Sequence, residues 1–187
     1  MIYTEVCLKE KISELMDSFE NEVVEFKEAR SNFSFNDIGK YFSALSNEAN
    51  LRGLSEAWLI FGISDCKKIV GTEFRKQGGL QNLKRELVNG TNERLTFMEI
   101  YELFINGCRV IAFQIPPAIR GIPTTWQGAA YAREHESVSP LPEVLSEFQK
   151  SKKVSNLLQA MKKEGVIAAR GGNRYAKWFL VKNGSDL

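Results

Sequence analysis

Four carboxylates are the side chains of this sequence best placed to do chemistry. Glu20, Glu22 and Glu25 lie in one short segment that contains two valines, and Asp65 follows the apolar run 57–63. If both segments are strands, Glu25 and Asp65 come to one edge of a sheet. Hard carboxylate oxygens are the ligands that Mg²⁺ and Mn²⁺ prefer, and a bound metal could activate water or neutralise a leaving oxygen. The alternative is that these acids are solvated or pair with nearby cations.

Basic residues form the second candidate set. Residues 150–187 hold nine Lys or Arg and two Asp or Glu, a net charge of +7, while residues 1–149 hold 16 basic and 21 acidic residues, a net charge of −5. A basic tail on an acidic body favours contact with a polyanion, although a solvated charged helix has the same composition. The candidate phosphate contacts are Lys27, Arg30, Arg75, Lys76 and Arg133 in the body, and Lys152, Lys153, Lys162, Lys163, Arg170, Arg174 and Lys177 in the tail. Each of them could instead be an ordinary surface cation.

Other kinds of site have little support in the sequence. His135 is the only histidine, and the three cysteines lack metal-ligand spacing and a visible base partner. The glycine-rich stretch 71–79 lacks the Gly-Lys-Ser/Thr of a phosphate-binding loop, so ATP hydrolysis is not predicted. There is neither an apolar run of about 18 residues nor a signal-peptide pattern. We therefore expect a cytoplasmic protein with reduced cysteines, no membrane segment and no cofactor other than Mg²⁺ or Mn²⁺ at the carboxylates.

The apolar spacing predicts an α+β domain in which a mixed β-sheet is flanked by helices. Helices are expected over residues 8–19, 38–49 and 79–89. Ser34 followed by Asp37 resembles a capping box for the second helix, and Gly53 can end it.

Three segments predict strands of this sheet. The run 57–63 is apolar throughout, which is typical of a central strand buried on both faces. Asn106-Gly107 is the preferred pair for a type I′ turn and joins the strand-like runs 95–104 and 108–115. A further strand is expected over 129–133, and the tryptophans are expected to be core aromatics.

The proline-containing segment 139–142 predicts a boundary between a first domain, residues 1–141, and a basic tail, residues 142–187. In the tail, apolar residues at helical spacing over 154–161 predict a helix, and two strand-like runs lie on either side of 170–174.

Several of these segments, in the same order, resemble the Schlafen-type AlbA domain, which also occurs in bacterial proteins labelled RecG-related helicases or transcriptional regulators. They are residues 20–27, 42–47, 58–65, 69–72, 121–128, 131–133 and 137–141. One segment departs from the family: members often carry Asn-Thr-x-Gly-Gly before the central strand, and residues 47–56 lack that glycine pair. The tail resembles the end of a winged helix, with a recognition helix and its exit over 154–167 and a wing tip at 170–174.

The resemblance implies a site and a choice of functions. In Schlafen-type nucleases two glutamates and an aspartate hold a divalent metal beside the scissile phosphate, and Glu20, Glu25 and Asp65 match them by motif. That site lies between two AlbA-like lobes, so a chain with one lobe would need a homodimer. We predict a nucleic-acid-binding protein, with DNA the expected partner, that acts in transcriptional regulation. A metal-dependent endoribonuclease and a protein-interaction or dimerisation module are the alternatives.

Overall fold

The structure is a computed structural model that describes residues 2–17, 23–134, 137–140, 163, 167–170 and 177–180. The chain divides into two units, Met1–Leu141 and Pro142–Leu187, and each is described by itself.

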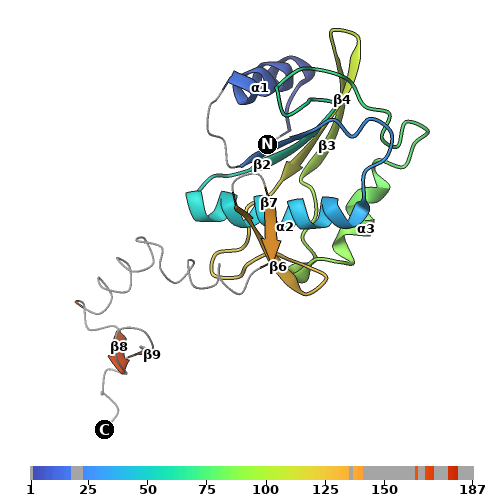
Figure 1. Cartoon of the computed structure of the whole chain (residues 1–187). Coiled ribbons are helices and arrows are strands. Elements are labelled where there is room, and N and C mark those ends of the chain that lie inside the picture. Colours follow the sequence, from blue (N-terminus) through green and yellow to red (C-terminus); the bar gives the residue numbers. More distant parts are fainter. Residues whose placement is uncertain are drawn as a thin grey trace. The chain divides into compact units, whose positions relative to one another are not determined.

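The first unit is built on a four-stranded sheet with the order β1-β2-β4-β3 (Figure 1). Its strands are β1 (Val24–Lys27), β2 (Ala57–Phe61), β3 (Glu99–Ile105) and β4 (Cys108–Ile115). β1 runs parallel to β2, whereas the other neighbouring pairs are antiparallel. The described helices are α1 (Glu5–Asp17), α2 (Phe35–Arg52) and α3 (Asn82–Val88). The predicted α+β class, a mixed sheet with flanking helices, is confirmed.

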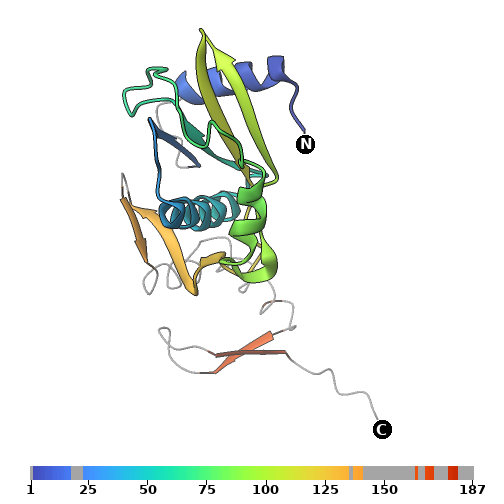
Figure 2. The same cartoon turned by 90° about the vertical axis from the view of Figure 1, so that its right-hand side faces the viewer.

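Helices cover both faces of the sheet, α1 one face and α2 the other (Figures 1 and 2). β2 alternates large apolar side chains toward each face. Phe61 contacts the ring of Phe113, which continues through Phe97 to Phe42 of α2. Trp58 points the other way and contacts Tyr3, just before α1. All five residues of β2 are buried, as expected for this run.

Local signals set the ends of α2 and the turn of the β3–β4 hairpin. The Ser34 hydroxyl accepts the backbone N–H of Asp37, and Gly53 ends α2 with a φ of 66°. Asn106 and Gly107 have φ values of 51° and 79°, so the predicted I′ turn is confirmed. β3 begins at residue 99 rather than 95; residues 92–94 form a 3₁₀ turn, and residues 95–98 connect that turn to the strand.

A second sheet packs against α2. It has the order β5-β6-β7 and consists of β5 (Thr125–Trp126), β6 (Ala129–Glu134) and β7 (Ser137–Pro140). The strand expected over 129–133 is therefore present. Trp58 and Trp126 are 1% and 2% exposed, which confirms both as core aromatics.

In the second unit, β8 (Ile167–Arg170) and β9 (Lys177–Leu180) pair antiparallel, at the two positions where strands are expected. Most of the predicted recognition helix lies outside the described residues, which include only Lys163 and Ile167 of the range 154–167. The segment 171–174 also lies outside them, so the winged helix stays a prediction. No helix in the described part of the chain is long and apolar enough to span a membrane.

Candidate functional site

Glu25 lies on β1, the edge strand of the main sheet, and its side chain is only 8% exposed. Each carboxylate oxygen faces a cation. Lys27 Nζ lies 2.7 Å from Oε1, and Arg133 Nη2 of β6 lies 2.8 Å from Oε2. A buried carboxylate needs such charge-assisted partners because the loss of hydration is otherwise uncompensated.

Lys27 connects this buried carboxylate to the surface. Its Nζ is 3.9 Å from Asp65 Oδ1, and Asp65 is 86% exposed in the turn after β2. Burial lowers the pKa of Lys27, but the hydrogen bond and the charge of Glu25 outweigh it, so that the pKa is raised. The ammonium also lies 5.5 Å from the Tyr41 ring centroid. The structure therefore brings Glu25 and Asp65 to one edge of the sheet, with a protonated lysine between them.

The described residues do not fit a divalent metal at this edge. Among them, no group of three or more His, Cys, Asp or Glu could hold a metal ion. Both oxygens of Glu25 already face cations, and Asp65 is its only candidate co-ligand that is described, because Glu20 lies outside the described residues.

The predicted phosphate contacts fall into two groups. Lys27 and Arg133 are held by Glu25, and Arg75 makes a bidentate pair with Glu86 at 3.0 and 2.7 Å. That hydrogen bond from Arg75 lowers the pKa of the Glu86 carboxyl. The two exposed members of this predicted set in the body are Arg30 and Lys76.

Arg30 and Lys76 make only surface ion pairs. The Arg30 side chain is 74% exposed and pairs with Glu28, and that of Lys76 is 61% exposed and pairs with Glu73. In the tail, Lys163 is exposed, and the strand backbones at Arg170 and Lys177 pair with each other. Lys152, Lys153, Lys162 and Arg174 lie outside the described residues.

Two hollows beside the β3–β4 hairpin share Lys76 and a further cation, Arg109. The first, of about 350 Å³, is lined by Arg75, Lys76, Gly78, Gly79, Leu80, Gln81, Asn82, Ile100, Glu102 and Arg109. The second, of about 390 Å³, is lined by Arg30, Val70, Gly71, Thr72, Glu73, Lys76, Phe104, Gly107, Cys108 and Arg109. Arg30 therefore lies at the second hollow, away from the cations that Glu25 neutralises.

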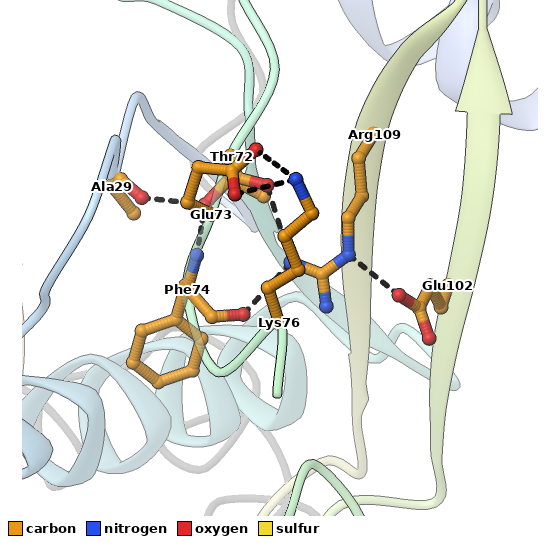
Figure 3. A network of polar contacts seen from close by, with 7 residues as sticks. All are labelled: Ala29, Thr72, Glu73, Phe74, Lys76, Glu102 and Arg109. Atoms are coloured by element: carbon orange, nitrogen blue, oxygen red, sulfur yellow. Dashed lines mark hydrogen bonds and ion pairs between the residues drawn. The ribbon is translucent and has the colours of Figure 1, made fainter. Parts of the chain in front are cut away.

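Arg109 is fixed in place by three acceptors (Figure 3). Nε donates to Glu102 Oε1 at 2.5 Å, and Nη1 donates to the carbonyls of Thr72 and Phe74 at 3.2 and 2.8 Å. The side chain is 7% exposed. The loop 72–74 is held in turn by the Thr72 hydroxyl, which donates to the carbonyl of Ala29.

A family model described as Schlafen, AlbA_2 matches residues 20–142. The chain belongs to this family. No curated protein matches it. One similar solved structure is the DIP2311 protein of Corynebacterium diphtheriae, with 16% identity, a TM-score of 0.49, and coverage of 79% of this chain and 28% of that one. Another is the N-terminal domain of a putative ATP-dependent DNA helicase RecG-related protein of Nitrosomonas europaea, with 22% identity, a TM-score of 0.41, and coverage of 68% and 88%.

Three of the segments that resemble the AlbA_2 family are joined by hydrogen bonds. Asn47, at the end of the 42–47 segment, accepts the Thr124 N–H at 2.7 Å and donates to the carbonyls of Thr124 and Tyr131, both at 3.0 Å. Ser43 of the same helix donates to the Thr124 carbonyl at 2.6 Å. These residues attach the second sheet of the AlbA_2 domain to α2.

Arg109 is a cation of this AlbA_2 domain that was not among the predicted phosphate contacts. One signal could have found it, because Arg109 is the only charged residue in the mostly apolar strand 108–115. A charge in such a strand has to be buried with partners or face a ligand. Two of its three acceptors, the carbonyls of Thr72 and Phe74, come from a loop more than 30 positions away, so the sequence alone did not indicate them.

Proposed function

We propose that this AlbA_2 protein binds nucleic acid, mainly through backbone phosphates, with DNA as the expected partner and regulation of transcription as the setting. One observation carries the proposal. The second hollow is lined by three cations, Arg30, Lys76 and Arg109, and by a single carboxylate, Glu73. Membership of the AlbA_2 family supports the same kind of role.

The strength of the existing ion pairs indicates which cations are available to phosphate. Exposed pairs such as Arg30–Glu28 and Lys76–Glu73 contribute about 0–1 kcal/mol each, so a phosphate can replace the carboxylate. Lys27 and Arg133 are held by a buried carboxylate, and releasing them would leave that charge uncompensated. The proposed interface therefore includes Arg30 and Lys76 rather than Lys27 and Arg133.

The salt dependence of binding tests this proposal. We expect the affinity for labelled duplex DNA or RNA, measured by fluorescence anisotropy, to fall linearly with salt on a log–log plot. Replacing Arg30 and Lys76 together by Gln should reduce that slope by about 2, roughly one for each lost phosphate contact. The matched control removes two half-buried charges from α1, Lys9→Gln with Lys11→Gln, on the other face of the sheet. A salt-independent affinity, or an equal loss in both double variants, would contradict the proposal.

The tail has its own test within the full chain. Replacing Lys152, Lys153, Lys162 and Lys163 by Gln should weaken binding further if the basic tail contacts phosphates. Unchanged affinity would favour a tail that contacts a protein partner or a second copy of the chain. The homodimer that a two-lobed site would need stays a prediction.

A further inference from the structure

We infer that the second hollow, between the loop 70–76 and the β3–β4 hairpin, binds an unpaired nucleotide segment. The phosphate would contact Arg109 and Lys76, and the base would stack on Phe104. This inference rests on the proposed function and narrows it to single-stranded nucleic acid or to a locally unpaired stretch. It assigns a role to Arg109 and Phe104, two residues that neither the motifs nor the charge pattern select.

Arg109 has donors left over. A guanidinium carries five N–H bonds. The bond on Nε and the two on Nη1 are used by Glu102, Thr72 and Phe74. In the described part of the chain no acceptor is found for the two bonds on Nη2, which Figure 3 shows without a dashed contact. Among the described residues, Nη2 is not a fully buried atom that lacks a hydrogen-bond partner. It is therefore accessible from the hollows that Arg109 lines.

The fixed orientation of this arginine suits an oxyanion. Because three bonds hold the guanidinium plane, little side-chain entropy remains to be lost when Nη2 donates to a ligand. The neighbouring Lys76 is exposed and pairs only with Glu73 at the surface, so its ammonium can turn toward the same ligand. A planar donor group next to a mobile ammonium is a combination that binds phosphate oxygens well.

Phe104 stands directly across the hairpin from Arg109. The two residues are register partners in the β3–β4 ladder, which places their side chains on one face of the hairpin as close neighbours. The Phe104 side chain is 57% exposed and lines the second hollow together with Arg30, Lys76 and Arg109. An exposed aromatic ring beside a cationic groove is the arrangement that stacks bases of single strands, because every unpaired base has a free face.

Two cations, Arg109 and Lys76, next to the exposed ring of Phe104 favour one class of ligand, a nucleotide segment with an unpaired base. A duplex offers phosphates but keeps its bases stacked, so it would use Arg109 and Lys76 and leave Phe104 uncovered. An acidic peptide would likewise use only the cations. A nucleotide segment with an unpaired base uses both, since each nucleotide offers a phosphate to the cations and a free base face to the ring.

The test compares single-stranded and duplex ligands on the full chain. Labelled oligo(dT), oligo(U) and a duplex of the same length are titrated by anisotropy at one salt concentration. Phe104→Ala should weaken single-strand binding at least about fivefold, the size expected for one base–aromatic stack, and leave duplex binding nearly unchanged. The matched control is Ile122→Ala, which truncates another exposed apolar residue outside the hollow. Phe104→Trp should restore binding, because a larger ring still stacks.

Arg109 is tested without relying on a variant that could unfold. In the wild-type protein, nuclear magnetic resonance should show thymidine 5′-monophosphate shifting the Arg109 side-chain signals and the backbone amides of 70–76 and 104–109. Arg109→Lys, which keeps the charge but loses Nη2, should abolish those shifts if it folds. Nucleotide shifts confined to other segments would overturn the assignment of Arg109.

The outcomes separate this inference from the proposed function. If the protein binds nucleic acid with a steep salt dependence but Phe104→Ala and Ile122→Ala behave alike, the unpaired-nucleotide site is wrong and the proposed function stands. If the wild-type protein binds neither single strands nor duplex at low salt, the proposed function is wrong, and this inference is wrong with it.

Discussion

Glu25 and Arg133 join the edge of the main sheet to the second sheet of the domain. Arg133 Nη2 of β6 lies 2.8 Å from Glu25 Oε2, while Nη1 of the same side chain donates to the Val24 carbonyl at 2.6 Å. The side chain of Arg133 is 17% exposed and that of Glu25 is 8% exposed. Glu25, one of the predicted metal ligands, therefore has a structural role in the described part of the chain. It neutralises Arg133, which comes from a strand far away in the sequence.

The first prediction concerns this structural role. Glu25→Gln keeps the shape of the side chain but removes the charge opposite Lys27 and Arg133. Because both cations are mostly shielded from water, we expect the free energy of unfolding to fall by about 2–4 kcal/mol. Urea denaturation followed by circular dichroism measures the loss.

The matched control is Glu28→Gln. Glu28 directly follows β1, the strand that carries Glu25. Glu28 pairs with Arg30 at the surface, where the side chains are 41% and 74% exposed. Its substitution should change stability by less than about 0.5 kcal/mol. If Glu25→Gln were as mild as Glu28→Gln, the ion pairs of Glu25 would contribute no net stability, and the residue would be available for another task.

The second prediction concerns metal-dependent cleavage. Because both oxygens of Glu25 face cations, we expect structured RNA and duplex DNA to remain intact with Mn²⁺ as with EDTA, and to be shifted on a low-salt gel in both cases. Fragments that require Mn²⁺ and disappear in a Glu20→Gln, Glu25→Gln double variant, but persist in Glu28→Gln, would instead make the protein a nuclease. The same gel would then locate its ligands.

The third prediction concerns Asn47, which is 1% exposed and makes three hydrogen bonds to the segment 124–131. Asn47→Leu is similar in size but removes the buried hydrogen-bond partner of the Thr124 N–H and of the Tyr131 carbonyl, while the Thr124 carbonyl still accepts from the Ser43 hydroxyl. Each such loss is worth roughly 1 kcal/mol or more, so we expect destabilisation of about 2–4 kcal/mol. Thermal and urea unfolding should both report it.

Asn50→Leu is the control for Asn47, since it makes the same change one turn later in α2. The Asn50 side chain has no hydrogen bond among the described residues and is only partly buried. We expect a change of less than about 1 kcal/mol there. Equal losses of stability at both positions would mean that α2 is destabilised by leucine in general. The hydrogen bonds of Asn47 to the segment 124–131 would then not be the cause.

The sequence predicted those parts of the fold that depend on neighbouring residues. The hydroxyl of Ser34 reaches an amide three residues away, Gly53 ends a helix by its own backbone conformation, and Asn106-Gly107 sets a two-residue turn. Each of these depends on local chemistry. The buried strand followed equally from its unbroken apolar run.

The candidate site was less predictable because its partners are brought together by the tertiary fold. The motif placed Glu25 and Asp65 at one edge, and the structure agrees, but nothing in the sequence indicated that Arg133 would face Glu25. Whether a cation is exposed or neutralised likewise depends on contacts from distant segments. This is why Arg75 and Arg30 read alike in the sequence and differ in the structure.

The last prediction concerns Trp126, whose ring is held between two glycines. A Cβ built at Gly39 of α2 or at Gly90 would overlap the indole, and the indole N–H donates to Asn36 Oδ1 at 2.7 Å. Gly→Ala inside a helix usually stabilises it by about 1 kcal/mol. Gly39→Ala should instead destabilise the domain by about 2 kcal/mol or more, because the ring cannot move away without losing its hydrogen bond.

A double-mutant cycle separates this contact from other effects of the alanine. In a Trp126→Leu background the smaller side chain leaves room for the new methyl group, so Gly39→Ala should cost much less there, or recover the stabilisation normal for a helix. Urea unfolding followed by circular dichroism gives all four free energies. The same loss in both backgrounds would show that the ring of Trp126 is not what requires glycine at position 39.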